Sequence, residues 1–287
     1  MPLFKAEKLT HVYSINTPFE RTAIHEIDFT AEKGEYIGII GHTGSGKSTF
    51  IQHLNGLLRP TSGQIFYNGQ DVNESKDFRR KLRFKVGLVF QYPEYQLFAE
   101  TVYEDIAFGP KNMQLSDAEI DERVLEAAEF VSLSEDLLKK SPFELSGGQK
   151  RRAAIAGVIA MRPEVLILDE PTAGLDPRGR AEIMQNIMRY KNANDATVIL
   201  VTHSMEEIAL TVERIVILEN GKVSMDTTPA TAFSDSDRLM KMGLAVPKAA
   251  MVAERLRALG LPLEGSIYTS DHLRVALESM NKSGVSA

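Results

Sequence analysis

Five short apolar runs recur along the chain and predict the strands of a buried sheet. They span residues 36–40, 86–90, 165–169, 197–202 and 214–219. Each is apolar at almost every position, which is typical of parallel strands that helices cover on both faces. Further runs near 3–13, 24–31 and 64–68 predict a small antiparallel sheet beside it. The pattern therefore predicts an α/β fold.

A long stretch between the second and third of these strands has a mostly helical composition. Ser116 stands where a helix N-cap is expected and Glu119 follows at the capping-box position, so a helix is predicted from there to Val131. The expected parts are a core of about residues 1–90 and 162–232, a helical insertion of about 92–161, and a C-terminal extension of 233–287 with amphipathic helices near 247–259 and 270–280.

A glycine-rich loop follows the strand at 36–40 and precedes a predicted helix at 49–58. It matches G-x-x-x-x-G-K-[ST] in the strand–loop–helix context that this phosphate-binding motif requires, so a chance glycine-rich turn is the weaker interpretation. The glycines aim backbone N–H groups at an anion, and the helix N-terminus adds positive potential. We expect Lys47 to reach the β- and γ-phosphates and Ser48 to bind Mg²⁺. The predicted ATP-binding residues of the loop are Gly41, His42, Thr43, Gly44, Ser45, Gly46, Lys47, Ser48 and Thr49.

Two carboxylates end the apolar run at 165–169. Ligands collect at the C-terminal ends of parallel strands, and neighbouring strand residues point to opposite faces. We therefore expect Asp169 to hold Mg²⁺ opposite Ser48, and Glu170 to polarise an attacking water molecule. A solvated acidic turn is the alternative.

A second glycine motif, residues 145–149, opens a predicted helix that continues through 150–160. Ser146 is a favourable N-cap, and the two glycines that follow allow close approach by an anion. An ordinary capped helix start is the alternative, which the presence of the phosphate loop upstream disfavours. The motif consists of Leu145, Ser146, Gly147, Gly148 and Gln149.

Composition narrows the function classes. The chain has 287 residues and no cysteine, so disulfides and zinc–cysteine sites are excluded. Its net charge is −6 and its pI is about 5.6, which argues against a nucleic-acid partner. No apolar run approaches the ~20 residues needed to span a bilayer, and the N-terminus lacks a signal-peptide pattern. We expect the protein to stay in the cytosol.

These motifs together resemble the ATP-binding cassette (ABC) ATPases, over roughly residues 3–232. The resemblance implies a P-loop NTPase core with a parallel sheet, an antiparallel β subdomain, the inserted helical subdomain and a small C-terminal extension. It also implies that Tyr13 lies against adenine, that Gln91 contacts Mg²⁺ and the attacking water, and that His203 contacts the γ-phosphate. Asp176 ends the D-loop, where this chain has Ala173-Gly174 instead of the serine and alanine common in the family.

The family's mechanism implies that one copy of the chain is catalytically incomplete. Lys47, Glu170 and His203 act from this subunit, whereas residues 145–149 act in trans on the nucleotide of a partner ATPase. Two head-to-tail subunits would then enclose two ATP molecules, and hydrolysis would let the dimer open.

Particular segments resemble the energy-coupling factor (ECF) importers, which take up vitamins or transition-metal ions. They are residues 53–57, 89–98 and 105–110, and His42-Thr43 is similar to the second, A-prime type of ATPase. The resemblance implies a heterodimer with another ABC ATPase, an integral membrane coupling protein and a separate substrate-capture membrane protein, with this chain peripheral at the cytoplasmic face of the membrane. A homodimeric ATPase of a conventional importer is the main alternative, and a non-transport ABC ATPase is a further one.

The segment after Gln91 mixes aromatic and acidic residues. The resemblance implies that it docks an arginine-bearing helix of the coupling protein. A stripe buried within the helical subdomain is the alternative. The C-terminal extension is implied to help hold the two ATPases together. The candidate docking residues are Tyr92, Glu94, Tyr95, Leu97 and Phe98.

Overall fold

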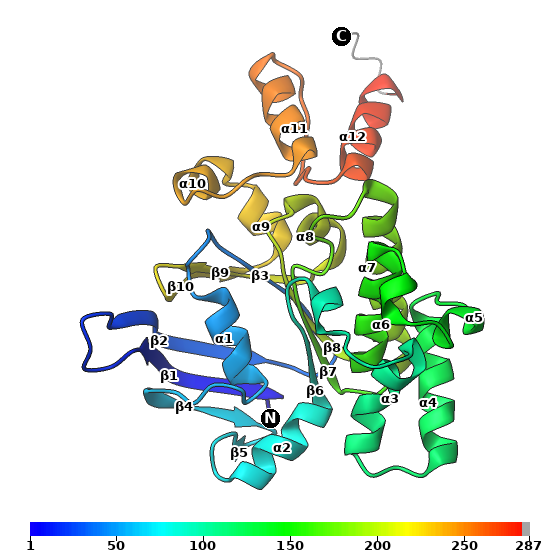
Figure 1. Cartoon of the computed structure of the whole chain (residues 1–287). Helices are drawn as coiled ribbons and strands as arrows, with labels where there is room; N and C mark the ends of the chain where they lie inside the picture. The colour runs from blue at the N-terminus through cyan, green and yellow to red at the C-terminus, as the bar shows by residue number, and fades with distance from the viewer. Residues whose placement is uncertain (283–287) are drawn as a thin grey trace.

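The structure is a computed structural model, and it describes residues 1–282. Its main sheet has six strands in the order β10-β9-β3-β8-β7-β6 (Figure 1). β10 pairs antiparallel with β9, and the other neighbours are parallel. All residues of β3, β6, β7 and β8 are buried, as the apolar runs predicted. The strands are β3 (Tyr36–Ile40), β6 (Val86–Val89), β7 (Val165–Asp169), β8 (Thr197–Val201), β9 (Arg214–Glu219) and β10 (Lys222–Thr227).

A four-stranded antiparallel sheet, in the order β2-β1-β4-β5, packs beside the main sheet. Helix α1 (Lys47–Leu54) joins the two, because its Phe50 belongs to the same buried cluster as Phe29 of β2 and Ile37 of β3. The two phenylalanine rings lie 5.2 Å apart, edge to face. The α/β prediction is confirmed. The strands are β1 (Phe4–Tyr13), β2 (Arg21–Ala31), β4 (Ser62–Tyr67) and β5 (Gln70–Asp71).

The insertion is helical, as predicted. Helices α3 and α6 pack closely at Gly157, where a Cβ would make an ordinary contact of 3.6 Å with the Asp105 carbonyl oxygen. The predicted capping box is present: the Glu119 amide donates to Ser116 Oγ, and the Ser116 amide donates back to Glu119. The elements are η1 (Pro93–Gln96), α3 (Val102–Asn112), α4 (Asp117–Phe130), α5 (Glu135–Leu138), η2 (Pro142–Glu144) and α6 (Gly147–Ile159).

Three further helices complete the core. The sequence predictions above do not include them. They are α2 (Lys76–Lys85), α7 (Pro177–Asn194) and α8 (Met205–Thr211). Helix α1 begins at the phosphate loop and ends at Leu54, four residues before the predicted end.

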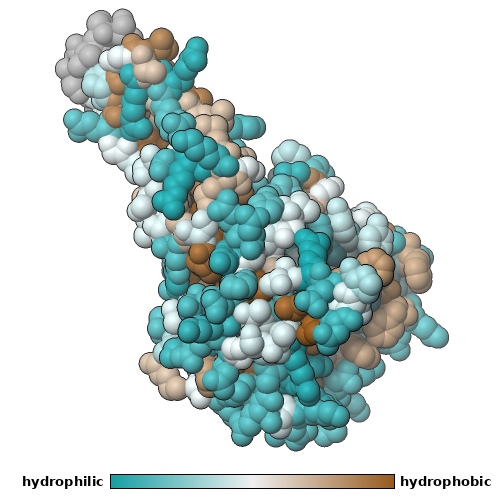
Figure 2. All heavy atoms as spheres, turned by 90° about the vertical axis from the view of Figure 1, so that its left-hand side faces the viewer, coloured by the Kyte–Doolittle hydropathy of each residue, from teal (hydrophilic) through white to brown (hydrophobic). Residues whose placement is uncertain are grey.

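The C-terminal extension stands out from the body of the molecule (Figures 1 and 2). Its outer part has a small core of its own, formed by Ala253, Leu263 and Ile267. The two predicted amphipathic helices are present, and residues 283–287 of the predicted extension lie outside the described part of the chain. No helix within residues 1–282 combines the length and hydropathy needed to cross a membrane. The helices are α9 (Pro229–Phe233), α10 (Ser236–Lys241), α11 (Lys248–Ala258) and α12 (Ser270–Lys282).

Candidate active site

The glycine-rich loop connects buried strand β3 to helix α1. Gly44 and Gly46 have φ angles of 81° and 103°, in the left-handed region that favours glycine. A Cβ on Gly46 would lie 2.6 Å from the carbonyl oxygen of Ala23. The loop therefore needs glycine at position 46 to pass over strand β2.

The start of α1 is suited to an anion. A helix leaves its first N–H groups without intrahelical acceptors. Here Gly46 provides no side-chain cap, and the first turn carries no acidic residue. The hydroxyl of Ser45, just before it, is fully buried and has no hydrogen-bond partner in the described structure. These unsatisfied groups fit the polyphosphate of a nucleotide.

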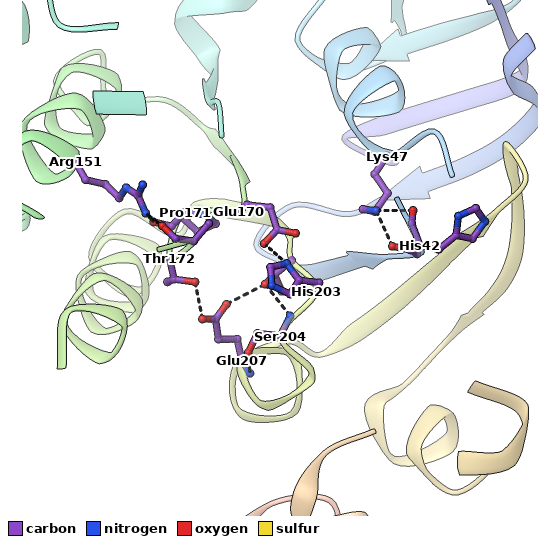
Figure 3. A network of polar contacts seen from close by, with 12 residues as sticks. His42, Lys47, Arg151, Glu170, Pro171, Thr172, His203, Ser204 and Glu207 are labelled. Carbon is purple, nitrogen blue, oxygen red and sulfur yellow. Dashed lines mark hydrogen bonds and ion pairs between the residues drawn. The ribbon is translucent and has the colours of Figure 1, made fainter. Parts of the chain in front are cut away.

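The Lys47 side chain lies inside the loop. Its Nζ donates hydrogen bonds of 2.6 Å to the carbonyl of Gly41 and 3.1 Å to that of His42 (Figure 3). Burial lowers the pKa of Lys47, while the negative charges of Glu170 and Asp169 oppose this shift. The ammonium group is thus held at the loop by carbonyl oxygens, and its predicted contact with phosphates stays a prediction.

Two of the three predicted Mg²⁺ ligands touch. Ser48 Oγ donates a 2.9 Å hydrogen bond to Asp169 Oδ2 across 121 residues of sequence. Burial raises the pKa of Asp169, whereas the Ser48 hydrogen bond and the charge of Lys47 oppose that rise. Gln91 follows neighbouring strand β6 and is exposed, with no hydrogen bond to either residue in the described structure. The oxygen donors suit Mg²⁺, which keeps several waters rather than needing a cage of carboxylates. The described residues contain no cluster of three or more acidic, His or Cys ligands.

Glu170 and His203 point toward each other (Figure 3). His203 Nδ1 lies 2.8 Å from Glu170 Oε2. Strand β7 ends at Asp169, and Glu170 has a φ of 52°, so the expected alternation of two strand residues is wrong at this point. The backbone still follows the sheet edge, since the Glu170 amide donates to the carbonyl of Val201 at 2.8 Å. The turn brings the predicted base against the predicted γ-phosphate ligand.

A buried carboxylate joins the two loops that carry these residues. Thr172 Oγ1 donates to Glu207 Oε1 at 2.6 Å, and Thr202 Oγ1 donates to Glu207 Oε2 at 3.1 Å. The Ser204 amide donates to Thr202 Oγ1, so the segment around His203 is fixed on both sides. Sequence reasoning missed this network. Ser204 followed by Glu207 predicts a helix cap, which α8 has, but not a carboxylate turned inward.

Tyr13 lies on the outer side of the phosphate loop. Its hydroxyl is 3.2 Å from Thr49 Oγ1, and the ring of His11 packs edge-on against it with centroids 4.5 Å apart. This places the predicted adenine-binding ring beside the loop. The hollow there is lined by Tyr13, Arg21, Ala23, Gly44, Gly46, Lys47, Ser48 and Thr49.

The second glycine motif lies in a different hollow. Ser146 caps α6 in a capping box with Gln149, and Leu145 is buried. A Cβ on Gly147 or Gly148 would meet no atom within 4 Å. Asp176, which caps α7 by accepting a 2.7 Å hydrogen bond from the Gly179 amide, lines the same hollow. None of the residues lining this hollow lines the one at the phosphate loop.

Glu94 already has a partner within the chain, and its predicted docking role stays a prediction. Its carboxylate forms two hydrogen bonds with the Arg151 guanidinium, 3.0 Å from Nε and 2.6 Å from Nη2. The Arg151 side chain is only 3% exposed and also donates to the carbonyls of Pro171 and Ala173. The pair is internal because α6 packs directly on η1. Arg151, which the sequence did not single out, thus ties three segments together.

The aromatic residues around Glu94 remain accessible. Tyr95 is 84% exposed and Phe98 is 65% exposed, so a fully buried stripe is ruled out; Tyr92 is exposed and Leu97 half-buried. Leu97 and Phe98 line a groove between η1, α2, α3 and α6. Asp105 lies in this groove. Its Oδ1 accepts from the amides of Phe98 and Ala99, while Oδ2 is buried without a partner in the described structure.

Comparisons with known proteins show the family of the chain. The family model described as "ABC transporter" matches residues 24–173, just over half of the chain. The energy-coupling factor transporter ATP-binding protein EcfA2 of Caldanaerobacter subterraneus is 50% identical over 274 residues, covering 96% of each chain. The protein of the same name from Ligilactobacillus salivarius is 46% identical over 286 residues, covering 97% of this chain and 99% of its own.

Solved structures give the same result. The cbiO1 protein of Clostridium perfringens, described as part of the ABC transporter complex cbiONQ, matches with a TM-score of 0.75 and 38% identity over 88% of this chain and 99% of its own. A dimeric ATP-binding cassette bound to ADP and Pi matches with a TM-score of 0.72, 29% identity and coverage of 79% and 98%. The chain therefore belongs to the ATP-binding cassette ATPases, in the family of energy-coupling factor transporter ATP-binding proteins.

Proposed function

We propose that this chain hydrolyses ATP as one half of an ATPase pair that drives an ECF-type importer for vitamins or transition-metal ions. One observation carries the pairing: the phosphate loop and the second glycine motif line separate hollows, and the glycines of the motif face open space within this chain. No atom of residues 1–282 occupies the space in front of these glycines, so a nucleotide bound to a partner subunit could lie there. The names of the ECF relatives support a second, similar ATPase as that partner.

The residues have separable roles in this proposal. The loop amides and Lys47 neutralise charge on the phosphates, and Tyr13 packs against the base. Glu170 accepts the proton of the attacking water, while His203, held 2.8 Å from it, orients the γ-phosphate side of the site. Ser48, Asp169 and Gln91 would hold Mg²⁺, which supplies electrostatic stabilisation of the transferring phosphate when bound. Ser146 and the two glycines that follow it would stabilise negative charge on the phosphates of the partner's nucleotide.

The groove beside η1 is the proposed docking site for a cytoplasmic helix of the membrane coupling protein. Asp105 Oδ2 is a buried acceptor without a donor in the described structure, and an arginine side chain of the occupant would supply that donor. The groove is otherwise lined by apolar side chains such as Phe98 and Phe108, with Arg80 and Arg83 on its α2 side. A helix with one arginine among apolar residues fits this pattern.

Replacing Asp105 with asparagine should weaken assembly with the membrane protein by about tenfold. The variant removes the charge at Oδ2 but keeps an acceptor for the Phe98 and Ala99 amides, and a hydrogen bond to a charged group contributes about 1.5–3 kcal/mol. The measurement is co-purification of the membrane protein together with ATPase activity of the free ATPase pair, which should not change.

Glu94→Gln is the matched comparison, since it alters the carboxylate that Arg151 already occupies. It should lower the thermal stability of the chain, because it leaves a buried guanidinium without a charged partner. Assembly that survives Asp105→Asn at wild-type affinity would rule out Asp105 as the receptor of an arginine.

The C-terminal extension is the proposed contact with the second ATPase. It projects from the body of the molecule (Figure 2). It exposes apolar side chains: Met251 and Val252 on α11, Leu259 just after α11, and Val275 and Leu277 on α12. Continuity with the dimer proposed above supports the partner ATPase as the occupant.

Co-purification from detergent-solubilised membranes tests the proposed function. We expect the tagged chain to recover a second ATPase and an integral membrane protein, as a peripheral subunit at the cytoplasmic face would. A variant with Val252→Asp and Val275→Asp should lose much of the second ATPase, since each change places a charge in the proposed contact. Recovery of the chain alone, with ATPase activity independent of its concentration, would contradict both pairing and transport.

A further inference from the structure

We propose that Arg21 is a second phosphate-binding cation of the nucleotide site, acting on the outer side of the glycine-rich loop. The inference deepens the proposed function, because it assigns a ligand to a residue that no motif identifies. It rests on three observations: strand register, distance to the loop, and the absence of any other partner among residues 1–282.

The register of the antiparallel sheet places Arg21 beside the adenine-binding ring. Tyr13 at the end of β1 pairs directly with Arg21 at the start of β2. Directly opposed residues of an antiparallel pair present their side chains on the same face. Because the Tyr13 hydroxyl reaches Thr49 in the first turn of α1, this face looks onto the phosphate loop.

The guanidinium is close to the loop backbone. A Cβ built on Gly44 would lie 3.3 Å from Arg21 Nη2. Arg21 lines the same hollow as Lys47 and Ser48. Gly44 has a φ of 81° and is exposed, and its lack of a Cβ avoids a tight contact with the guanidinium. An anion in this hollow would contact the guanidinium and the loop amides.

Arg21 has no competing partner within the described residues. No hydrogen bond, ion pair or ring contact involves its side chain, although a guanidinium carries five donors. The neighbouring Glu20 is engaged elsewhere, since its Oε2 accepts a 2.9 Å hydrogen bond from the Asn16 amide. Because no acid of the described part of the chain pairs with it, this cation is available to an anionic ligand.

Arg21 and Lys47 would approach the polyphosphate from opposite sides. Lys47 is held inside the loop by the carbonyls of Gly41 and His42. Arg21 extends from the β-sheet over the exposed side. A planar guanidinium can bind two phosphate oxygens through a rigid fork of parallel N–H donors, whereas an ammonium group acts as a point charge with rotatable donors. The pair would position the nucleotide between its base-binding ring and its phosphate loop.

Calorimetric titration of the full-length chain with ADP and with adenosine tests the proposal. Arg21→Gln should raise the Kd for ADP about tenfold, the loss expected for one charged hydrogen-bonding contact. Its Kd for adenosine should stay within twofold of wild type. The Kd of Arg21→Lys for ADP should fall between those of the wild type and Arg21→Gln. Lysine keeps the positive charge but loses the two parallel N–H donors of the guanidinium. Lys139→Gln is the control: Lys139 is an exposed cation of the helical insertion that lines neither hollow.

Each other outcome counts against the proposal. Unchanged ADP affinity in Arg21→Gln would show that the side chain does not bind phosphate. An equal loss for ADP and adenosine would mean that it supports the base or the sheet instead. Failure of the wild-type chain to bind ADP would overturn the nucleotide site itself, and with it this inference. A thermal melt of each variant separates these results from unfolding.

Discussion

Replacing Glu170 with glutamine should reduce ATP hydrolysis by the assembled ATPase pair by about 10²- to 10⁴-fold, the range that a positioned general base contributes. Glutamine keeps the size of the side chain and can still hydrogen-bond to His203, which lies 2.8 Å away. It cannot accept the proton of the attacking water. Nucleotide affinity should therefore stay near wild type, while phosphate release almost stops.

The stalled reaction gives a second measurement. Because ATP is bound but not cleaved, the pair should accumulate in its closed form, which size-exclusion chromatography with ATP would detect. Glu213→Gln is a suitable control, since Glu213 is an exposed carboxylate that pairs with Lys191 away from both hollows. Near-normal hydrolysis in Glu170→Gln would exclude this carboxylate as the base, and Asp169 would then be the remaining acid next to Ser48.

Much of the fold follows from local sequence pattern. Strands β3, β7 and β8 lie within a residue of their predicted positions because each is buried on both faces and therefore apolar throughout. Strand β5 has two residues, too few to show any period. Helix α7 was missed although Asp176-Pro177 is a good start signal. Asp176 caps this helix, and its predicted D-loop role stays a prediction.

The candidate site also combines features that the local sequence predicts with features that it does not. The glycine-rich loop and the capped helix at Ser146 are local motifs, so the residues that form them could be named in advance. Pairings across the chain could not. The sequence places Glu94 among the carboxylates of a predicted docking segment, but it gives no sign that Arg151, 57 residues away, pairs with it. Asp105 has the same chemistry and keeps a free oxygen. Which acid stays unpaired depends on how α6 packs on η1, and that is decided by the whole helical insertion.

Gly148→Ala is the sharpest test of the proposal that two ATPase subunits share each nucleotide site. Gly148 lies in the first turn of α6 with ordinary helical geometry, and a Cβ there would meet nothing within 4 Å in this chain. Alanine should therefore fit, and it should even stabilise the helix by up to about 1 kcal/mol. Yet we expect ATP hydrolysis by the pair to fall about 10²- to 10³-fold, because the methyl group would occupy the space of the partner's phosphate and displace a backbone donor.

A matched change at the other glycine motif separates the two sites. Gly46→Ala should damage this chain's own nucleotide binding, since its Cβ would lie 2.6 Å from the Ala23 carbonyl oxygen. Gly148→Ala should leave ADP binding by the isolated chain untouched and lower turnover only at the site that contains the partner's phosphate loop. If Gly148→Ala instead weakens ADP binding by the isolated chain, the motif serves this chain's own nucleotide. A lone copy could then be catalytically complete.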